Sequence, residues 1–311
     1  MRQQTLKTAI PCSGAALLSG CRVRMTLQPA PADSGIVFRR NDLPGQPQLR
    51  ATLDKARAND LALTLAAGAL RIERVELLLA ALAGCGIDNA VIELDGPEPP
   101  ELDGSAAAFA FLIGCAGRQQ QKDARKVLTL TRPLRLSAPG RYALLRPGGD
   151  ARLRLRAAGQ CCEHRPGEDD FARSLAPARR AWEEERIVAL RRRGLLRGWR
   201  EDRALTLHDG RLYSPQGLRF ADESLRHDLC RALGALSLLG GPWQGTLLLR
   251  GASLGMILRL LRRLLNEEDS HAWRALPEPP QEDPLPQAAQ PPLPGLADRP
   301  LTLPRKAGAS L

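Results

Sequence analysis

Two kinds of apolar spacing alternate along the chain. Apolar and polar positions alternate, as in strands with one buried face, in RMTLQP, GIVFRR and ARLRLRA. NAVIEL is typical of a buried strand, and VLTLTRPLRL, RYALLRP and GTLLLRG predict further strands. Apolar residues at helical spacing predict helices over 69–82, 105–116, 224–239 and 254–265. The segment ALTLHDGRLYS predicts two strands that turn at its DG dipeptide. Both halves therefore combine several strands with two helices, which predicts an α+β fold of two similar domains without an obvious sequence repeat.

Composition along the chain suggests where those domains begin and end. The charged stretch RQQQKDARK (118–126) follows the second predicted helix and predicts a boundary between domains. We expect a first α+β domain at 1–120 and a second at 126–273, with a charged insertion near 182–207. The residues 274–311 are rich in proline and poor in large apolar side chains, so they predict a mobile tail.

The net charge of the chain bears on its binding partners rather than on its fold. The net charge of +11 favours anionic partners. The basic residues are nearly all Arg, and a GC-rich genome produces the same excess of Arg, Ala and Leu, so composition alone identifies no partner. No recognised nucleic-acid-binding motif is present, and we expect no nucleic-acid partner.

Cysteine usage indicates the compartment. The seven cysteines are odd in number and form no CxxC pair, which argues against a disulfide framework and favours a reducing compartment. The segment LSGC (18–21) has the form of a lipoprotein cleavage box, but the stretch TAIPCSGAALL before it contains Pro, Ser and Gly and makes a poor export signal. No apolar run is long enough to cross a membrane as a helix. We therefore expect a cytoplasmic protein.

Several motifs, in order along the chain, point to one family. They are QTLK, SGAALLSG and TLQPAPADSGIVFRR near the N-terminus, ERVELLLAALAGCGIDNAVIELDGPEPPELDGSAAAF (73–109), and GLRFADESLRHDLCRALGAL (217–236). From about residue 3 to 273 the sequence resembles the zinc-dependent UDP-3-O-acyl-N-acetylglucosamine deacetylases of lipid A biosynthesis. The resemblance implies two α+β domains packed helix face to helix face around a site for a UDP-linked acyl-glucosamine, in the cytoplasm of a Gram-negative bacterium.

The same resemblance assigns roles to a few positions. Amide hydrolysis by zinc needs three protein ligands, an open position for water and a carboxylate base. Glu76 stands at the position of the base, and Leu77 stands where the family has a ligand His. His227 matches a second ligand, but Arg231 occupies the position of the ligand Asp four residues later. A guanidinium cannot coordinate zinc, so one of three ligands remains.

At other positions of the family's site, this chain also lacks the residue that the family has. Two further family histidines, one in a glycine-rich turn and one acting as general acid, correspond to Leu18 and Leu254. Asp228 and Ala235 replace a Lys and an Asp of the second helix, and Arg180 aligns less securely with a Thr that stabilises the oxyanion. Three catalytic His positions have thus become Leu, which predicts a site filled with core side chains. Asp228 and Arg231, three apart on a helix, predict an ion pair, and Glu76 is expected to contact an Arg.

The functional prediction is a non-catalytic member of this family that binds no zinc cofactor. A rewired site of Glu76, His227 and Cys230 lacks a third convincing ligand. The insertion segment 182–202 is charged where the family has an apolar passage for the acyl chain; an amphipathic helix there would turn its apolar side chains inward, namely Ile187, Leu190, Leu195 and Leu196. We expect a binding or regulatory role, with the UDP-acyl-glucosamine precursor or an authentic deacetylase as partner and peripheral association with the inner membrane. The alternative is an active deacetylase with an altered metal site.

Overall fold

The computed structural model describes residues 1–157 and 159–276, so the predicted tail, apart from its first three residues, lies outside the described residues. The elements of the first half, each bounded as follows, are β1 (Arg2–Leu6), β2 (Ile10–Ala15), β3 (Arg22–Pro29), β4 (Ile36–Arg40), β5 (Gln48–Arg50), β6 (Ala56–Ala58), β7 (Leu63–Ala67), β8 (Leu70–Ile72), α1 (Glu76–Gly84), β9 (Ala90–Leu94) and α2 (Ala107–Ala116). The strands β2-β3-β9-β4-β5 form one sheet in that order, and β6-β7-β8 form a second, smaller one.

The second half contains a larger sheet and a separate small one. Its elements are β10 (Arg118–Ala124), β11 (Lys126–Leu130), β12 (Leu134–Ala138), β13 (Arg141–Arg146), β14 (Ala151–Ala157), β15 (Gln160–His164), α3 (Phe171–Ser174), β16 (Ala181–Glu183), α4 (Glu184–Arg192), η1 (Glu201–Arg203), β17 (Leu205–His208), β18 (Arg211–Tyr213), α5 (Glu223–Leu236), η2 (Ser237–Leu239), β19 (Trp243–Arg250), α6 (Leu254–Asn266), η3 (Glu268–Ser270) and β20 (His271–Ala275). The seven-stranded sheet runs β12-β13-β19-β11-β20, with β14 beside β19 and β15 beside β14. β16-β17-β18 form a three-stranded sheet.

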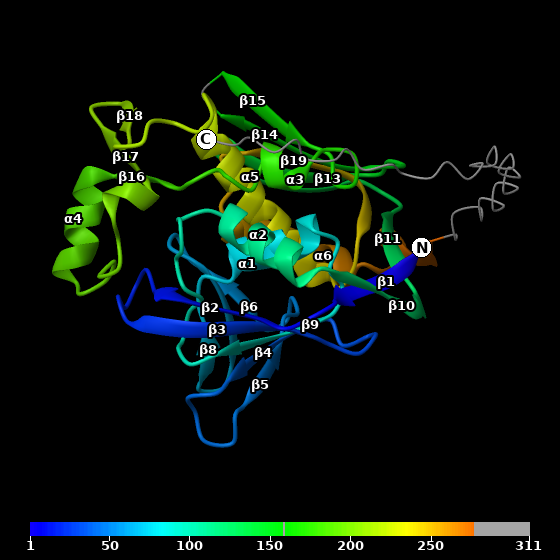
Figure 1. Cartoon of the computed structure of the whole chain (residues 1–311). Helices are drawn as coiled ribbons and strands as arrows, with labels where there is room; N and C mark the ends of the chain where they lie inside the picture. The colour runs from blue at the N-terminus through cyan, green and yellow to red at the C-terminus, as the bar shows by residue number, and fades with distance from the viewer. Residues whose placement is uncertain (158, 277–311) are drawn as a thin grey trace, which may run out of the picture. The chain divides into compact units, whose positions relative to one another are not determined.

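The predicted α+β class is confirmed: strands and helices mix in both halves, and the main helices lie between the sheets (Figure 1). α1 and α5 pack directly on each other. Gly234 of α5 makes this close approach feasible, because a Cβ at that position would lie 2.0 Å from the backbone oxygen of Glu76. The main core of buried apolar side chains, mostly Leu and Ala, runs through both halves. None of the helices in residues 1–157 and 159–276 combines the length and the apolar character needed to cross a membrane.

One local prediction was wrong, and one strand was not foreseen. The helix expected over 69–82 begins only at Glu76, because Leu70–Ile72 pairs with β7 as β8 and Arg74 adopts a left-handed backbone conformation (φ 57°) that a helix cannot contain. The charged stretch 118–126, where we expect a boundary between domains, contains the strand β10, which pairs with β1. Backbone hydrogen bonds to a neighbouring strand need no apolar side chains, so the polar sequence gave no warning.

The turn at Asp209–Gly210 was predicted correctly. Both residues have positive φ (47° and 72°), as a two-residue hairpin loop requires, and they join β17 to β18. In the insertion, the predicted amphipathic helix is α4. Its Ile187 and Leu190 are buried, as is Leu196 beyond it, whereas Leu195 is only half-buried.

Candidate functional site

Glu76 is the first residue of α1 and is almost completely buried. One carboxylate oxygen, Oε2, accepts a hydrogen bond from the backbone N–H of Leu63 at 3.0 Å. The other, Oε1, lies 3.7 Å from Nε of Arg231 on α5. The predicted contact between Glu76 and an Arg is thus present, and both oxygens of the carboxylate face protein groups.

Leucines fill the three positions where the resemblance places catalytic histidines. Leu18, Leu77 and Leu254 are 8%, 5% and 5% exposed. Leu77 and Leu254 belong to the main hydrophobic core. These side chains contribute packing at positions where a site for water and substrate would need polar groups.

His227 lies on α5 and is buried. Its Nδ1 is 3.1 Å from the carbonyl oxygen of Ala178, so the neutral ring donates this hydrogen bond from Nδ1. Burial, followed by the positive charges of Arg231 and Arg180, holds the pKa of His227 well below its ordinary value. The ring is therefore neutral at physiological pH.

Arg231 connects the helices across the site. Its Nη1 lies 3.6 Å from Oδ1 of Asp228, which is the i,i+3 ion pair expected from the sequence. Its Nε is buried and has no hydrogen-bond partner, because the Glu76 oxygen is too distant for one.

Two more arginines add positive charge near His227. Arg180 lies over the ring of Trp182 at 4.0 Å and donates to the carbonyl oxygens of Leu61 and Asp60 at 2.7 and 2.5 Å. Burial, together with repulsion from Arg231 and Arg74, lowers the pKa of Arg180 to about 9. The positive electrostatic field of these arginines disfavours the binding of a divalent cation near His227.

Arg74 was not singled out by the sequence, although its left-handed backbone marks it in the structure. It pairs with Glu101 at 2.9 Å, and both side chains are largely buried. Burial lowers the pKa of Arg74, but the carboxylates of Glu101, Glu76 and Glu98 outweigh this and raise it.

The donor groups near His227 do not fit a zinc site. Within residues 1–157 and 159–276, no three or more His, Cys, Asp or Glu side chains come together in an arrangement that could hold a metal ion. Cys230 is fully buried, and burial raises the pKa of its thiol. The other histidines lie on β15, β17 and β20.

The insertion builds a second hydrophobic cluster against the turn that contains Leu18. This cluster consists of Leu17, Leu18, Trp182, Ile187, Leu190, Leu196 and Ala204. Backbone bonds reinforce the contact: the N–H groups of Arg197 and Gly198 donate to the carbonyls of Leu18 and Leu17 at 3.2 and 3.0 Å. Gly198 is needed there, because a Cβ would lie 1.9 Å from the carbonyl oxygen of Ala16.

A buried ion pair anchors the segment beside His227. Arg179 and Glu223 have side chains that are 0% exposed, with Arg179 Nε 2.8 Å from Glu223 Oε1. Arg179 also donates to Ser214 Oγ at 2.9 Å and to the Gly217 carbonyl at 2.7 Å, and the N–H of Arg219 donates to Glu223 Oε2 at 2.7 Å. Sequence reasoning missed this pair, since 44 residues separate its members and no local motif joins them.

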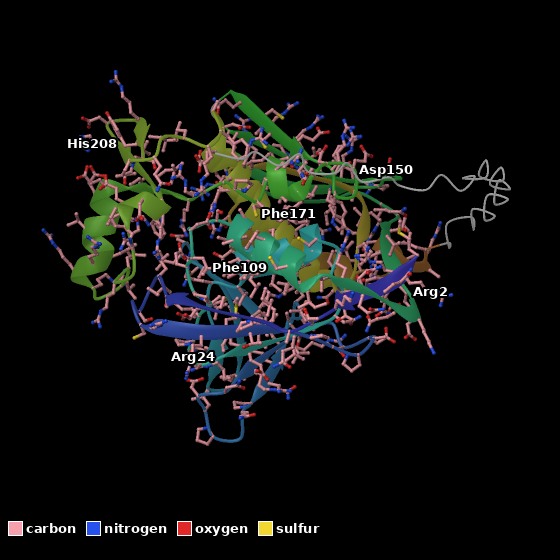
Figure 2. All side chains as sticks on the ribbon, viewed as in Figure 1. Arg2, Arg24, Phe109, Asp150, Phe171 and His208 are labelled. Carbon is pink, nitrogen blue, oxygen red and sulfur yellow. The ribbon has the colours of Figure 1, made fainter. Side chains whose placement is uncertain are left out.

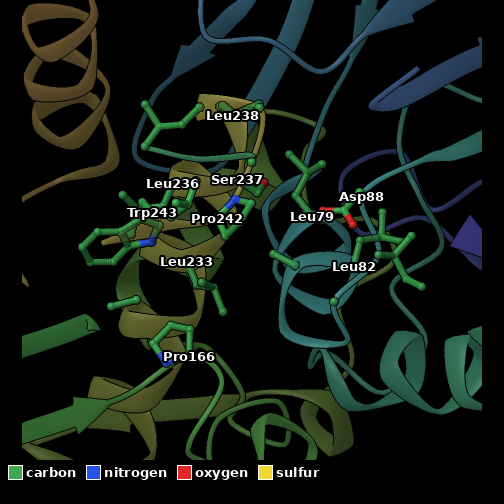
Figure 3. A pocket seen from close by; sticks show the side chains of 18 of the residues that line it. Leu79, Leu82, Asp88, Pro166, Leu233, Leu236, Ser237, Leu238, Pro242 and Trp243 are labelled. Atoms are coloured by element: carbon green, nitrogen blue, oxygen red, sulfur yellow. The ribbon is translucent and has the colours of Figure 1, made fainter. Parts of the chain in front are cut away.

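A cavity of about 820 Å³ lies at the C-terminal ends of α1 and α5, whereas Glu76 stands at the N-terminal end of α1. Figure 3 shows Leu79 and Leu82 of α1 facing Leu233, Leu236 and Leu238 across it, with Pro242 and Trp243 nearby. The lining also includes charged residues, namely Arg50, Asp54, Asp88, Arg118, Arg125, Asp150 and Glu168. Neither Glu76 nor His227 lines this cavity.

Comparisons with known proteins agree with the two-half α+β arrangement. The model of the LpxC family, UDP-3-O-acyl N-acetylglycosamine deacetylase, matches residues 3–266. A UDP-3-O-acyl-N-acetylglucosamine deacetylase of Acidithiobacillus ferrooxidans is 36% identical over 282 residues, which cover 88% of this chain and 92% of that protein. Proteins with the same name from Myxococcus xanthus and Anaeromyxobacter are 35% and 36% identical over 85% and 86% of this chain and 87% and 90% of their own. The chain belongs to the UDP-3-O-acyl-N-acetylglucosamine deacetylase family.

Proposed function

We propose that this protein is a non-catalytic member of the deacetylase family that keeps the fold and acts by binding. The observation that carries the proposal is Arg231, whose guanidinium stands beside Glu76 at the position that the resemblance gives to a metal ligand. The Arg231 guanidinium, 3.7 Å from the carboxylate at the position of the base, supplies a positive charge there and cannot coordinate a metal ion.

The surroundings of Glu76 support the same conclusion. A general base must be free to accept a proton from water. Glu76 instead accepts a backbone hydrogen bond from Leu63 and faces Arg231, and its side chain is 3% exposed. A water molecule has little access to this carboxylate.

The insertion supports loss of the acyl-binding passage. Trp182, Ile187, Leu190 and Leu196 direct their apolar surface onto the Leu17–Leu18 turn. Their burial there stabilises a closed cluster, because apolar surface removed from water contributes about 25 cal/mol per Å². An acyl chain would have to displace these contacts.

The cavity supports a remaining binding role. Its volume of about 820 Å³ lies within the range of ligand sites, and leucines of both helices form its walls. We propose that it accepts the apolar chain of a lipid precursor of the UDP-acyl-glucosamine type. The compartment that we propose is the cytoplasm at the inner-membrane surface.

The inactivity is tested with the purified full chain, UDP-3-O-acyl-N-acetylglucosamine and added zinc. We expect no deacetylation above background, and the matched Glu76→Ala variant should give the same background. Turnover that disappears in Glu76→Ala would overturn the proposal and favour the alternative, an active deacetylase with an altered metal site.

The binding role has a separate test with a fluorescent fatty acid as probe. Ala83 is half-buried and lines the cavity, so Ala83→Trp should fill part of it and weaken probe binding at least tenfold. Binding that is unchanged in Ala83→Trp would exclude the cavity as the site. A regulatory form of the role would appear as a changed rate when the chain is added to an authentic deacetylase of the same cell.

A further inference from the structure

The outer face of the seven-stranded sheet carries an unusual set of side chains. Along β13, β14 and β19 buried residues alternate with more exposed ones, and α5 and α6 pack on the buried side. The register fixes which side chains share the outer side: Arg156 lies opposite Arg250, and Arg250 opposite Tyr142; Arg152 lies opposite Thr246, and Thr246 opposite Arg146. Figure 2 shows side chains ending in nitrogen that stand off β14 and β15 on the side away from α5.

We call this surface the arginine face. Its members are Arg135, Tyr142, Leu144, Arg146, Arg152, Arg154, Arg156, Cys161, Glu163, Thr246, Leu248 and Arg250. Six of these side chains are guanidinium groups and one is a carboxylate.

The single carboxylate of the arginine face is already engaged. Glu163 lies 2.5 Å from Arg154, 3.6 Å from Arg152 and 3.2 Å from Arg165, the residue that follows β15. The loop after β15 adds Glu168, which pairs with Arg165 at 3.2 Å. Its two further carboxylates, Asp169 and Asp170, bind the backbone N–H groups of Arg165 and Arg173, respectively. These acids belong to the end of the sheet at which β15 finishes.

At the other end of the sheet, positive charge has no counter-charge. Arg156 and Arg250 lie directly opposite each other on neighbouring strands. Like charges in that position destabilise a sheet. Within residues 1–157 and 159–276, neither guanidinium group has an ion pair or a side-chain hydrogen bond, and the same is true of Arg146, which lies in the row of Arg152 at the first end of the sheet. No described carboxylate neutralises these charges, which leaves them available to an external anion.

The apolar members of the face indicate which anion. Leu144 and Leu248 are half-buried and adjacent, between the rows of arginines. Proteins that bind single-stranded nucleic acid stack successive bases on several aromatic rings. The arginine face offers one ring, Tyr142, and the Arg135 guanidinium already lies over it at 5.1 Å. A broad basic sheet face with an apolar centre matches the surface of a bilayer that contains anionic phospholipids.

We propose that the arginine face docks this protein onto an anionic phospholipid bilayer. The contact is electrostatic and reversible, with the arginines at the headgroups and the two leucines toward the interface. The proposal is independent of whether the protein catalyses a reaction, since the arginine face lies on the side of the sheet away from α5 and His227.

Vesicle co-sedimentation of the full chain tests the proposal. We expect binding to phosphatidylcholine vesicles that contain phosphatidylglycerol, none to phosphatidylcholine alone, and loss of binding between about 0.1 M and about 1 M NaCl, as the Debye length falls from about 10 to about 3 Å. The triple variant Arg146→Gln, Arg156→Gln, Arg250→Gln should lower the partition coefficient roughly 100-fold, because each Arg near an anionic surface contributes about a factor of five.

A matched control removes the same charge elsewhere. Arg192, Arg193 and Arg211 are exposed and lie on α4, next to it and on β18. Their replacement by Gln should leave partitioning within about threefold of the parent, and both triple variants should melt no lower than the parent. Equal loss in both variants would show a response to net charge alone and would overturn the proposal. Absence of vesicle binding by the parent, with or without binding of a single-stranded RNA probe to the arginine face, would also overturn it.

Discussion

The buried pair of Arg179 and Glu223 offers a demanding test of the packing beside the site. In Glu223→Gln the shape is kept and the negative charge is removed, so the guanidinium of Arg179 stays buried without a counter-ion. Both side chains are 0% exposed, and the carboxylate accepts bonds from the Arg179 backbone N–H at 3.0 Å and side-chain Nε at 2.8 Å. Breaking a buried pair by removing one partner costs about 3–5 kcal/mol.

The effect is measured by urea unfolding and calorimetry on the full chain. A loss of about 4 kcal/mol corresponds to a melting temperature roughly 7 °C lower for a chain of this size. Asp222→Asn is the matched control, one residue earlier: its pair with Arg226 (2.6 Å) is 23% exposed on the Asp side, so about 1 kcal/mol or less is expected. If Glu223→Gln costs no more than Asp222→Asn, the reasoning that this pair anchors the Ala178–Arg180 segment is refuted.

Three further predictions follow from the site and the buried histidines. The paired substitution Leu77→His and Arg231→Asp supplies the two missing ligand types and should bind about one zinc per chain by metal analysis, against far less for the parent; equal zinc in both would show that these positions do not face a common site. His164 is buried, and burial lowers its pKa, so the unfolded chain takes up a proton below pH about 6.5 that the folded chain refuses; stability should therefore fall with decreasing pH by up to about 1.4 kcal/mol per unit. In urea unfolding between pH about 7.5 and about 5, His164→Phe should reduce the slope of the unfolding free energy against pH. An unchanged slope would mean that other groups cause the loss of stability. Burial raises the pKa of the Cys162 thiol to about 11, so alkylation at pH about 8 should be much slower there than at exposed Cys161; comparable rates in peptide mass spectrometry would mean that β15 opens readily.

The sequence predicted much of the fold because periodic apolar patterns decide the buried faces of long elements. α5 and α6 lie where their leucines recur, and β9 and β19 where short apolar runs occur. The helix α1 was predicted too long because Leu70 fits both a helix face and the strand β8, and only the pairing with β7 decides between them. β10 has polar side chains at all positions except Ala124 and is paired through its backbone with β1, which no local pattern reveals.

The residues of the candidate site were likewise predicted only in part. Glu76, His227 and Arg231 were assigned to one site through the family resemblance, and the Arg that was expected beside Glu76 is Arg231. Arg74 and Arg179 were not foreseen, because each owes its position to partners distant in the sequence, Glu101 and Glu223. Side-chain burial over such separations depends on tertiary packing rather than on local propensity.

Zinc stoichiometry distinguishes a family member that has lost its metal site from an active deacetylase with an altered one. The purified full chain is incubated with excess zinc, desalted and analysed for bound metal and protein. We expect well under one zinc per chain, because Leu77 and Arg231 stand where the resemblance places two of the ligands, and Arg74 and Arg180 add positive charge near His227. One tightly held zinc per chain that is lost in His227→Ala would contradict this expectation.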